Sequence, residues 1–321
     1  MLSRVANSIY WMNRYIERVE NYARFMSVNI NLSYDVPGLF ADKWDSILTS
    51  TGDYESFRMC YDRADKDKIV DFMTFDLRNP NSMFRSLGEA RENARTIRET
   101  LPKEVWEHLN SFYLEVKTFS EKKDREIDNS NDFYEYIKKG CQLFFGMMDA
   151  TYTRNEGYQF ASLGKFLERA DKTSRFLDIR YFQFDAASEI KTPTPQELLI
   201  WSAVLKSVSA LNMYRQQYKT LKPQFIIELL IKDRDFPRAI CYCIKKAEYA
   251  LYRISGYRPQ DSYSNSAEKE ISKLKCDIDF TETSDILSKG IHKYLDEFQT
   301  RNNRIDLEIF KTYFELESTK Q

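Results

Sequence analysis

Two Glu-Arg dipeptides are the residues of this sequence best suited to do chemistry, Glu17-Arg18 and Glu168-Arg169. A carboxylate near a guanidinium can grip a charged ligand, serve as a general base or form a buried ion pair. Each dipeptide lies in a long amphipathic pattern, and successive helical residues point about 100° apart, so the two members cannot simply bond each other. We therefore expect reciprocal pairs between two packed helices, Glu17 with Arg169 and Glu168 with Arg18.

Four more residues on the same helix faces belong to this candidate ligand-binding site. Glu20 and Arg24 lie near Glu17, and Asp171 and Arg175 lie near Glu168. Arg18 falls on an aromatic flank of the apolar stripe, which predicts that it is at least half buried. Under one interpretation the pairs are structural, and removing one partner then costs about 3 to 5 kcal/mol. Under a second, they line a polar cleft that binds a carboxylate or amine ligand.

A third interpretation is a metal centre bridged by the four carboxylates of these faces. It lacks the histidines that accompany carboxylates in di-iron bundles, and Arg24 and Arg175 would compete for the same oxygen atoms. The cysteines offer no better set, because Cys241 and Cys243 have no second pair and the chain has only two histidines. The sequence therefore predicts no metal and no cofactor.

A second group of polar residues lies in the segment ARENARTIRE and comprises Arg91, Glu92, Asn93 and Arg95. An internal repeat described below places Glu248, Tyr249, Ala250 and Tyr252 at the corresponding positions. If these polar residues stabilised the fold of both copies, the second copy would be expected to keep them, and it does not. The segment is thus a candidate ligand or partner surface, and the alternative is a merely solvated face.

Composition restricts the class of protein. The 48 basic and 49 acidic residues nearly cancel, which argues against a nucleic-acid binder or a polybasic membrane surface. No apolar run approaches the roughly 20 residues that span a bilayer, and the charged start MLSRVANSIYWMNR does not resemble an export signal. No nucleophile–base arrangement or Gly-rich phosphate loop is present. We expect a cytoplasmic protein with reduced cysteines and no self-sufficient catalytic motif.

The elements that must position the Glu-Arg dipeptides belong to an internal repeat. Residues 15–25, YIERVENYARF, align with 166–176, FLERADKTSRF, at an offset of 151. Farther along, the offset becomes 157 and pairs Trp44 with Trp201, Tyr61 with Tyr218 and Pro80 with Pro237. This indicates a tandem duplication with six residues added around KTPTPQ, a first copy at 1–155 and a second at 156–321.

Helical periodicity dominates both copies. Apolar residues from Val5 to Ile30 recur at alternating spacings of four and three, and Phe160 to Leu177 repeat the pattern. Further helical segments are expected at 41–62, 81–100, 102–124, 131–155, 195–219, 222–232, 235–255 and 283–317, with a loop at 256–282. The predicted fold is all-α, an internally duplicated helical bundle whose two diverged copies pack around a shared core.

The motifs LSRVANSIYWMNRYIERVENYAR, GKFLERADKTSR, ARENARTIRE and RIDLEIFKTYF together resemble the bacterial alpha-E domain family, named for its Glu-Arg motif. The resemblance covers essentially the whole chain. One departure is Asn13, where the family usually has a glycine and the second copy has Gly164, and this longer side chain questions a close helix contact there.

The resemblance implies partners, since members of the family are associated with circularly permuted ATP-grasp ligases and transglutaminase-like proteins. The expected function is an accessory or substrate-binding partner of an amide or peptide ligase, which binds an amino-acid or peptide-like ligand or the ligase itself. The alternatives are a stand-alone enzyme that uses Glu17 or Glu168 as a general base, and a purely structural scaffold.

Overall fold

The protein is all-α. The computed structural model describes residues 1–35, 44–122, 131–183, 194–257 and 262–315, and these contain no strand. The first half holds α1 (Ser3–Asp35), α3 (Asp45–Thr51), α4 (Tyr54–Arg58), α5 (Lys66–Thr74), α6 (Met83–Thr96), the 3-10 turn η1 (Arg98–Thr100), α7 (Lys103–Ser120) and α8 (Asn131–Thr151). The second half holds α9 (Glu156–Gln183), α10 (Pro195–Ser207), α11 (Leu211–Gln217), α12 (Pro223–Ile227), the π-helical turn η3 (Glu228–Lys232), α13 (Ile240–Ser255), α14 (Ser266–Phe280), α15 (Thr283–Lys289), α16 (Ile291–Ile309) and the π-helical turn η4 (Phe310–Phe314).

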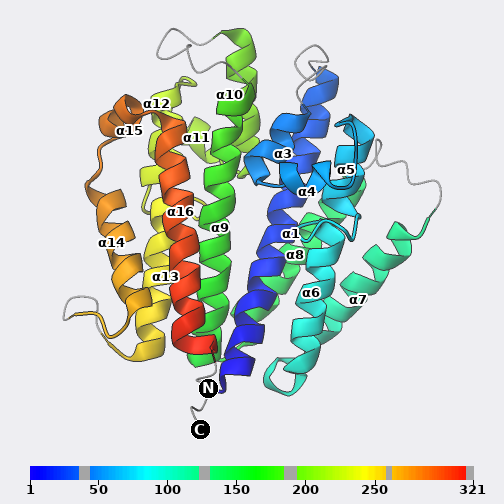
Figure 1. The fold of residues 1–321 in the computed structure, drawn as a ribbon, viewed down its shortest axis with the longest axis vertical. Coiled ribbons are helices and arrows are strands. Elements are labelled where there is room, and N and C mark those ends of the chain that lie inside the picture. The colour runs from blue at the N-terminus through cyan, green and yellow to red at the C-terminus, as the bar shows by residue number, and fades with distance from the viewer. Residues whose placement is uncertain (36–43, 123–130, 184–193, 258–261, 316–321) are drawn as a thin grey trace.

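The two longest helices form the centre of the bundle. Helices α1 and α9 run side by side, with α6 and α8 packed on α1 and with α13 and α16 packed on α9 (Figure 1). The apolar stripe explains this position, because Ile9, Ile16 and Val19 are fully buried, as are Leu163 and Leu167 of α9. Each central helix is thus covered by its own half and by the other central helix.

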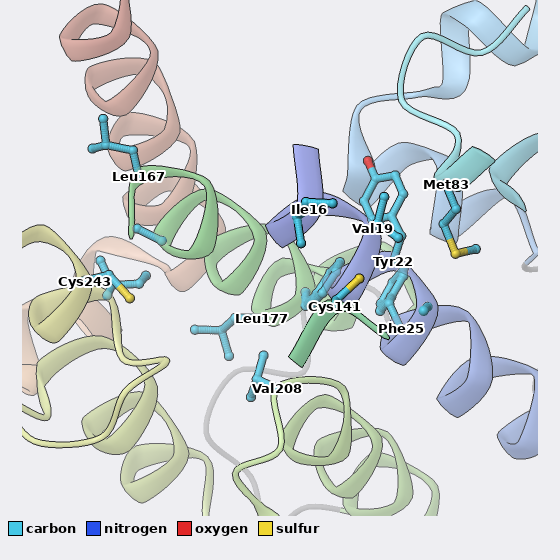
Figure 2. Packing of buried hydrophobic residues seen from close by; sticks show 14 of the residues in the cluster. Ile16, Val19, Tyr22, Phe25, Met83, Cys141, Leu167, Leu177, Val208 and Cys243 are labelled. Carbon is cyan, nitrogen blue, oxygen red and sulfur yellow. The ribbon is translucent and has the colours of Figure 1, made fainter. Parts of the chain in front are cut away.

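The two halves share one hydrophobic core. Figure 2 shows Ile16, Val19 and Tyr22 of α1 in the same packed region as Leu177 of α9 and Val208, which follows α10. Phe25 and Phe176, which correspond at the offset of 151, stack on each other with ring centroids 4.1 Å apart and planes 3° apart. This contact between matching residues of the two copies supports a shared core.

A close approach of the central helices depends on Gly164. A Cβ atom at this position would lie 2.4 Å from the backbone oxygen of Tyr10, so a larger residue would push α9 away from α1. The matching Asn13 is buried and donates from its amide to the Ile9 carbonyl of its own helix at 2.9 Å. The helices therefore keep a close contact at Gly164, while the Asn13 side chain is accommodated beside its own backbone.

The order of the helices supports the inferred duplication. Helices α4, α5 and α6 begin at Tyr54, Lys66 and Met83, and adding 157 to each number gives 211, 223 and 240, where α11, α12 and α13 begin. The boundary between residues 155 and 156 stays a prediction. The added residues around KTPTPQ lie largely outside the described part of the chain.

Several predicted segments are interrupted. Segment 41–62 breaks at Gly52, whose φ of +80° few other residues adopt, and 195–219 breaks where Ser209 has a φ of +55°. Segment 283–317 breaks at Gly290. The expected loop at 256–282 is wrong, because α14 occupies Ser266–Phe280 and buries a sparse apolar face of Ala267, Ile271, Leu274 and Ile278. Helix α5, capped by the Asp65 carboxylate, was not expected either.

Candidate functional site

Glu17 lies at the centre of the first polar cluster. Its carboxylate is fully buried and accepts two hydrogen bonds of 2.7 Å from Arg169 Nε and Nη2. Arg238 Nη1 donates to the same carboxylate at 3.2 Å, and Asn21 donates at 2.8 Å. Burial raises the pKa of Glu17, but Arg169 and Arg238 outweigh it and lower that pKa to about 2. The predicted Glu17–Arg169 pair is confirmed.

Glu168 lies at the centre of the second polar cluster and is also fully buried. Arg18 Nε donates to it at 2.7 Å and Arg18 Nη2 at 3.2 Å, so this predicted pair is confirmed too. Arg14 Nε adds a bond of 2.9 Å, and Lys172 Nζ lies 3.5 Å away. Burial raises the pKa of Glu168, yet the three cations hold it well below its usual range.

The remaining predicted residues extend each cluster. Arg24 donates to Glu20 at 2.6 Å, and Arg175 donates to Asp171 at 2.9 Å, each within one helix turn. We define the Glu17 cluster as Glu17, Glu20, Asn21, Arg24, Arg169 and Arg238, and the Glu168 cluster as Arg14, Arg18, Glu168, Asp171, Lys172 and Arg175. The structure therefore places all eight predicted residues in two buried or half-buried networks at the interface of α1 and α9.

Three cations of these networks were missed by the sequence analysis. Arg14 also forms an ion pair of 2.6 Å with Asp306 of α16, and Arg238 reaches Glu20 at 2.7 Å from the segment before α13. Lys172 bonds Asp171 at 3.0 Å. A signal existed for Arg14, which lies three residues before Glu17 as Lys165 lies three before Glu168. No signal existed for Arg238, whose counterpart is Asn81.

This geometry limits what the Glu-Arg pairs can do. A general base needs a carboxylate that a substrate proton can reach, usually with a raised pKa, whereas Glu17 and Glu168 are enclosed and have lowered pKa values. Their oxygen atoms are already occupied by cations of the chain. Within the described residues, no three His, Cys, Asp or Glu side chains form a group that could hold a metal ion. The arrangement is that of an internal clamp between the two central helices.

The second predicted surface lies on α6 and faces outward. Arg91 Nε donates to Asn110 of α7 at 2.8 Å, and its guanidinium lies 5.1 Å from the ring centroid of Tyr113. Arg95 bonds Glu92 at 2.8 Å, and its side chain is 59% exposed. Asn93 donates to the Glu89 carbonyl of its own helix. Arg91 is thus anchored to α7, whereas Arg95 and Glu92 are open to solvent.

A cavity of about 500 Å³ adjoins this surface. Aromatic and charged side chains line it together, from the segment between α4 and α5, the segment 75–78 and helices α5, α6 and α7, and they include Tyr61, Phe75, Arg78, Phe84, Tyr113 and Lys117. Phe84 and Tyr113 stack with centroids 5.7 Å apart, and Tyr113 is the ring under Arg91. Tyr113 therefore connects the predicted α6 surface with a cavity large enough for a small ligand.

No described helix has the combination of length and hydropathy that crossing a membrane requires. The five cysteines are free thiols, and Cys241 and Cys243 are buried on α13. Burial raises the pKa of the Cys243 thiol to about 12, so very little of it is ionised near pH 7.

Comparisons with known proteins agree with the sequence motifs. Three curated mycobacterial proteins, each called uncharacterized, are 22% identical over 303 residues, one from Mycobacterium bovis and two from Mycobacterium tuberculosis strains. The matches cover 84% of this chain and 31% of each relative, so the chain spans about a third of their length. No solved structure matches. Residues 1–314 match the Alpha-E family, described as a predicted alpha-helical domain with a conserved ER motif, and the chain belongs to that family.

Proposed function

We propose that this chain is a non-catalytic accessory domain of an amide- or peptide-ligase system, in which the Glu-Arg pairs hold the two halves together and the α6–α7 face does the binding. The single observation that carries the proposal is the 500 Å³ cavity, whose lining residue Tyr113 contacts Arg91 and whose lining includes neither Glu-Arg pair. Because the proposed binding face lies on α6 and α7, the Glu-Arg pairs need have no role other than a structural one.

The lining of the cavity favours an amino-acid or peptide-like ligand. Such a ligand carries an ammonium, a carboxylate and often an apolar side chain. Lys117 and Glu121, 3.8 Å apart, offer a cation for a carboxylate and an anion for an ammonium, and the rings of Phe84 and Tyr113 offer an apolar surface. Arg78 also lines the cavity, but its guanidinium is already bonded to Asp76. The lining thus combines four aromatic rings with charges of both signs, which suits a ligand that carries both charged groups and an apolar side chain.

The partner side of the proposal is an ATP-grasp ligase, as the family resemblance implies, with a transglutaminase-like protein as a second partner. The exposed charges of Glu92 and Arg95 are suited to polar contacts at the rim of a protein interface. The mycobacterial relatives contain long additional segments beside the matched region, which agrees with a domain that acts together with others.

Co-purification of the chain with the ATP-grasp ligase of the same organism tests this proposal. We expect the wild type to retain the ligase and the double variant Arg91→Glu/Arg95→Glu to lose most of it. The matched control is Lys245→Glu/Lys246→Glu, which reverses two exposed charges on α13 of the other half. Thermal melts must show that all three proteins are folded. If the wild type retains no ligase, or if both variants lose it equally, the proposal is wrong.

A further inference from the structure

Lys165 of α9 has an unusual environment. Its ammonium lies 4.1 Å from the ring centroid of Phe145 and makes no hydrogen bond or ion pair with any residue that the structure describes. It borders a small cavity of about 30 Å³, whose lining includes Asn13, Phe145, Asp149 and Ala161. An unpaired amine beside an unfilled space is a feature that the clamp does not require.

The other half shows how this position can be satisfied. Arg14, the counterpart of Lys165 at the offset of 151, is paired with Glu168 and with Asp306, and it also donates to the Tyr10 hydroxyl at 3.1 Å. The residue that corresponds to Tyr10 is Ala161, which has no hydroxyl and lines the small cavity.

The counterpart of Asp306 at the offset of 157 is Asp149, and it has other partners. Arg154 pairs with Asp149 at 2.7 Å, and the Tyr158 hydroxyl bonds the same oxygen atom at 3.2 Å. Of the three groups that satisfy Arg14, the Tyr10 hydroxyl has no counterpart at Lys165, and the counterpart of Asp306 is paired with Arg154 instead. The lost tyrosine ring leaves space.

The charges around Lys165 are unbalanced. The Glu17 cluster contains two carboxylates, Glu17 and Glu20, against three arginines, Arg24, Arg169 and Arg238. Lys165 faces Glu17 and Glu20 of α1, Arg169 of α9, Arg238 before α13 and Asp149 of α8. Asp149 is already balanced by Arg154, so one more anion at the amine would bring the charges of Lys165 and the Glu17 cluster to three negative and three positive.

We propose that the Lys165 amine takes up carbon dioxide and forms a carbamate. The nitrogen lone pair attacks the carbon atom, a C–N bond forms, and one C=O π pair moves to oxygen. The nitrogen releases one proton to solvent, so a neutral amine becomes a group with one negative charge. No oxidant or second enzyme is needed.

The size of the cavity and the protonation of the Lys165 amine both favour carbon dioxide. A cavity of about 30 Å³ has room for two or three non-hydrogen atoms, which admits carbon dioxide and excludes an amino acid or an acyl nucleotide. Burial, with Arg169 as the next cause, lowers the pKa of Lys165 to about 8, so a large fraction of the amine is neutral and nucleophilic near pH 8.

Trapping on the full chain tests the proposal directly. The wild type is equilibrated with ¹³C-bicarbonate at pH 8, alkylated with triethyloxonium ion and digested, and ethoxycarbonyl groups are located by mass spectrometry. We expect at least a tenfold higher occupancy at Lys165 than at Lys246, an exposed lysine that lies 5.3 Å from the ring centroid of Tyr242. A peptide with a free amino terminus, added to the sample, verifies that the trapping works.

A second measurement separates the carbamate from a bound bicarbonate ion. The melting temperature of the wild type should rise with bicarbonate at constant ionic strength, and that of Lys165→Arg should not. Equal occupancy at Lys165 and Lys246 would overturn the proposal, as would an equal rise of the melting temperature in both proteins. Both outcomes are independent of ligase binding, so they do not bear on the proposed function.

Discussion

The Glu17 cluster and the Glu168 cluster occupy corresponding places on α1 and α9, yet their charges are arranged differently. The Glu168 cluster holds the four cations Arg14, Arg18, Lys172 and Arg175 against the carboxylates of Glu168 and Asp171, and Arg14 also pairs with Asp306 outside the cluster. Around Glu17, three arginines face two carboxylates. The central pair is the same in both, and the flanking residues decide the balance.

The matching arginines at the cluster edges show the consequence. Asp171 raises the pKa of Arg175 well above its usual range, whereas burial and the neighbouring Arg238 lower the pKa of Arg24. Two pairs of corresponding positions that differ in residue type account for this difference. Asn81 stands where the second half has Arg238, and Lys172 stands where the first half has Asn21. A buried ion pair is thus retained at corresponding places in both halves while its surroundings differ in charge.

Separation of the halves is the most drastic way to break this comparison. Residues 1–155 alone would leave Glu17 without Arg169 and Arg238 and would expose the apolar face of α1 that α9 covers. We expect an aggregated or molten product, and mixing with 156–321 should restore part of the native helical signal. Circular dichroism and thermal melts measure this. A first half that unfolds cooperatively by itself would contradict the shared core.

Removal of the central carboxylates is expected to have the next largest effect. Glu168→Gln and Glu17→Gln should each destabilise the protein by about 3 to 5 kcal/mol, because each removes a buried negative charge that at least two arginines bond. Denaturant unfolding at pH 7 measures both, with Glu92→Gln on the exposed face of α6 as the control. A loss below 1 kcal/mol for either variant would mean that the pair is not a clamp.

Acid should remove the same contribution in the wild type. Glu17 has a usual pKa of 4.5 and a folded-state pKa of about 2. Because the folded value is depressed, its contribution is complete above pH 4.5 and is lost as the pH falls toward 2, at a cost of about 3 kcal/mol. Unfolding free energies measured from pH 7 to pH 3 should therefore fall less steeply in Glu17→Gln than in wild type. Parallel curves would show that Glu17 is not held in its charged form by the fold.

Much of this arrangement was predictable from the sequence, and the reason is periodicity. The alternating spacing of Val5 to Ile30 identifies α1 and its buried face, and the repeated Glu-Arg motif on α9 then requires reciprocal pairs. Helix α14 was missed because its apolar face is sparse, and α5 was missed because it is short and its start is marked mainly by the Asp65 cap. Arg238 could not be predicted, because its reach to Glu17 depends on how the segment before α13 packs on α1.

The smallest expected effect distinguishes the clusters most sharply, at the corresponding positions Arg14 and Lys165. Arg14→Met removes a buried cation that Glu168 and Asp306 both bond, and it should destabilise the protein by about 2 to 4 kcal/mol. Lys165→Met removes an amine without an ionic partner beside the Glu17 cluster, which already has an excess of arginines, and the methionine side chain can keep the packing on Phe145. In buffer free of carbon dioxide, its unfolding free energy should lie within about 0.5 kcal/mol of wild type, or above it. Urea unfolding of the two variants under these conditions decides the matter. Equal losses would mean that Lys165 has an ionic role like that of Arg14, and the contrast between the two clusters would then lie in Arg238 against Asn81 and in Lys172 against Asn21.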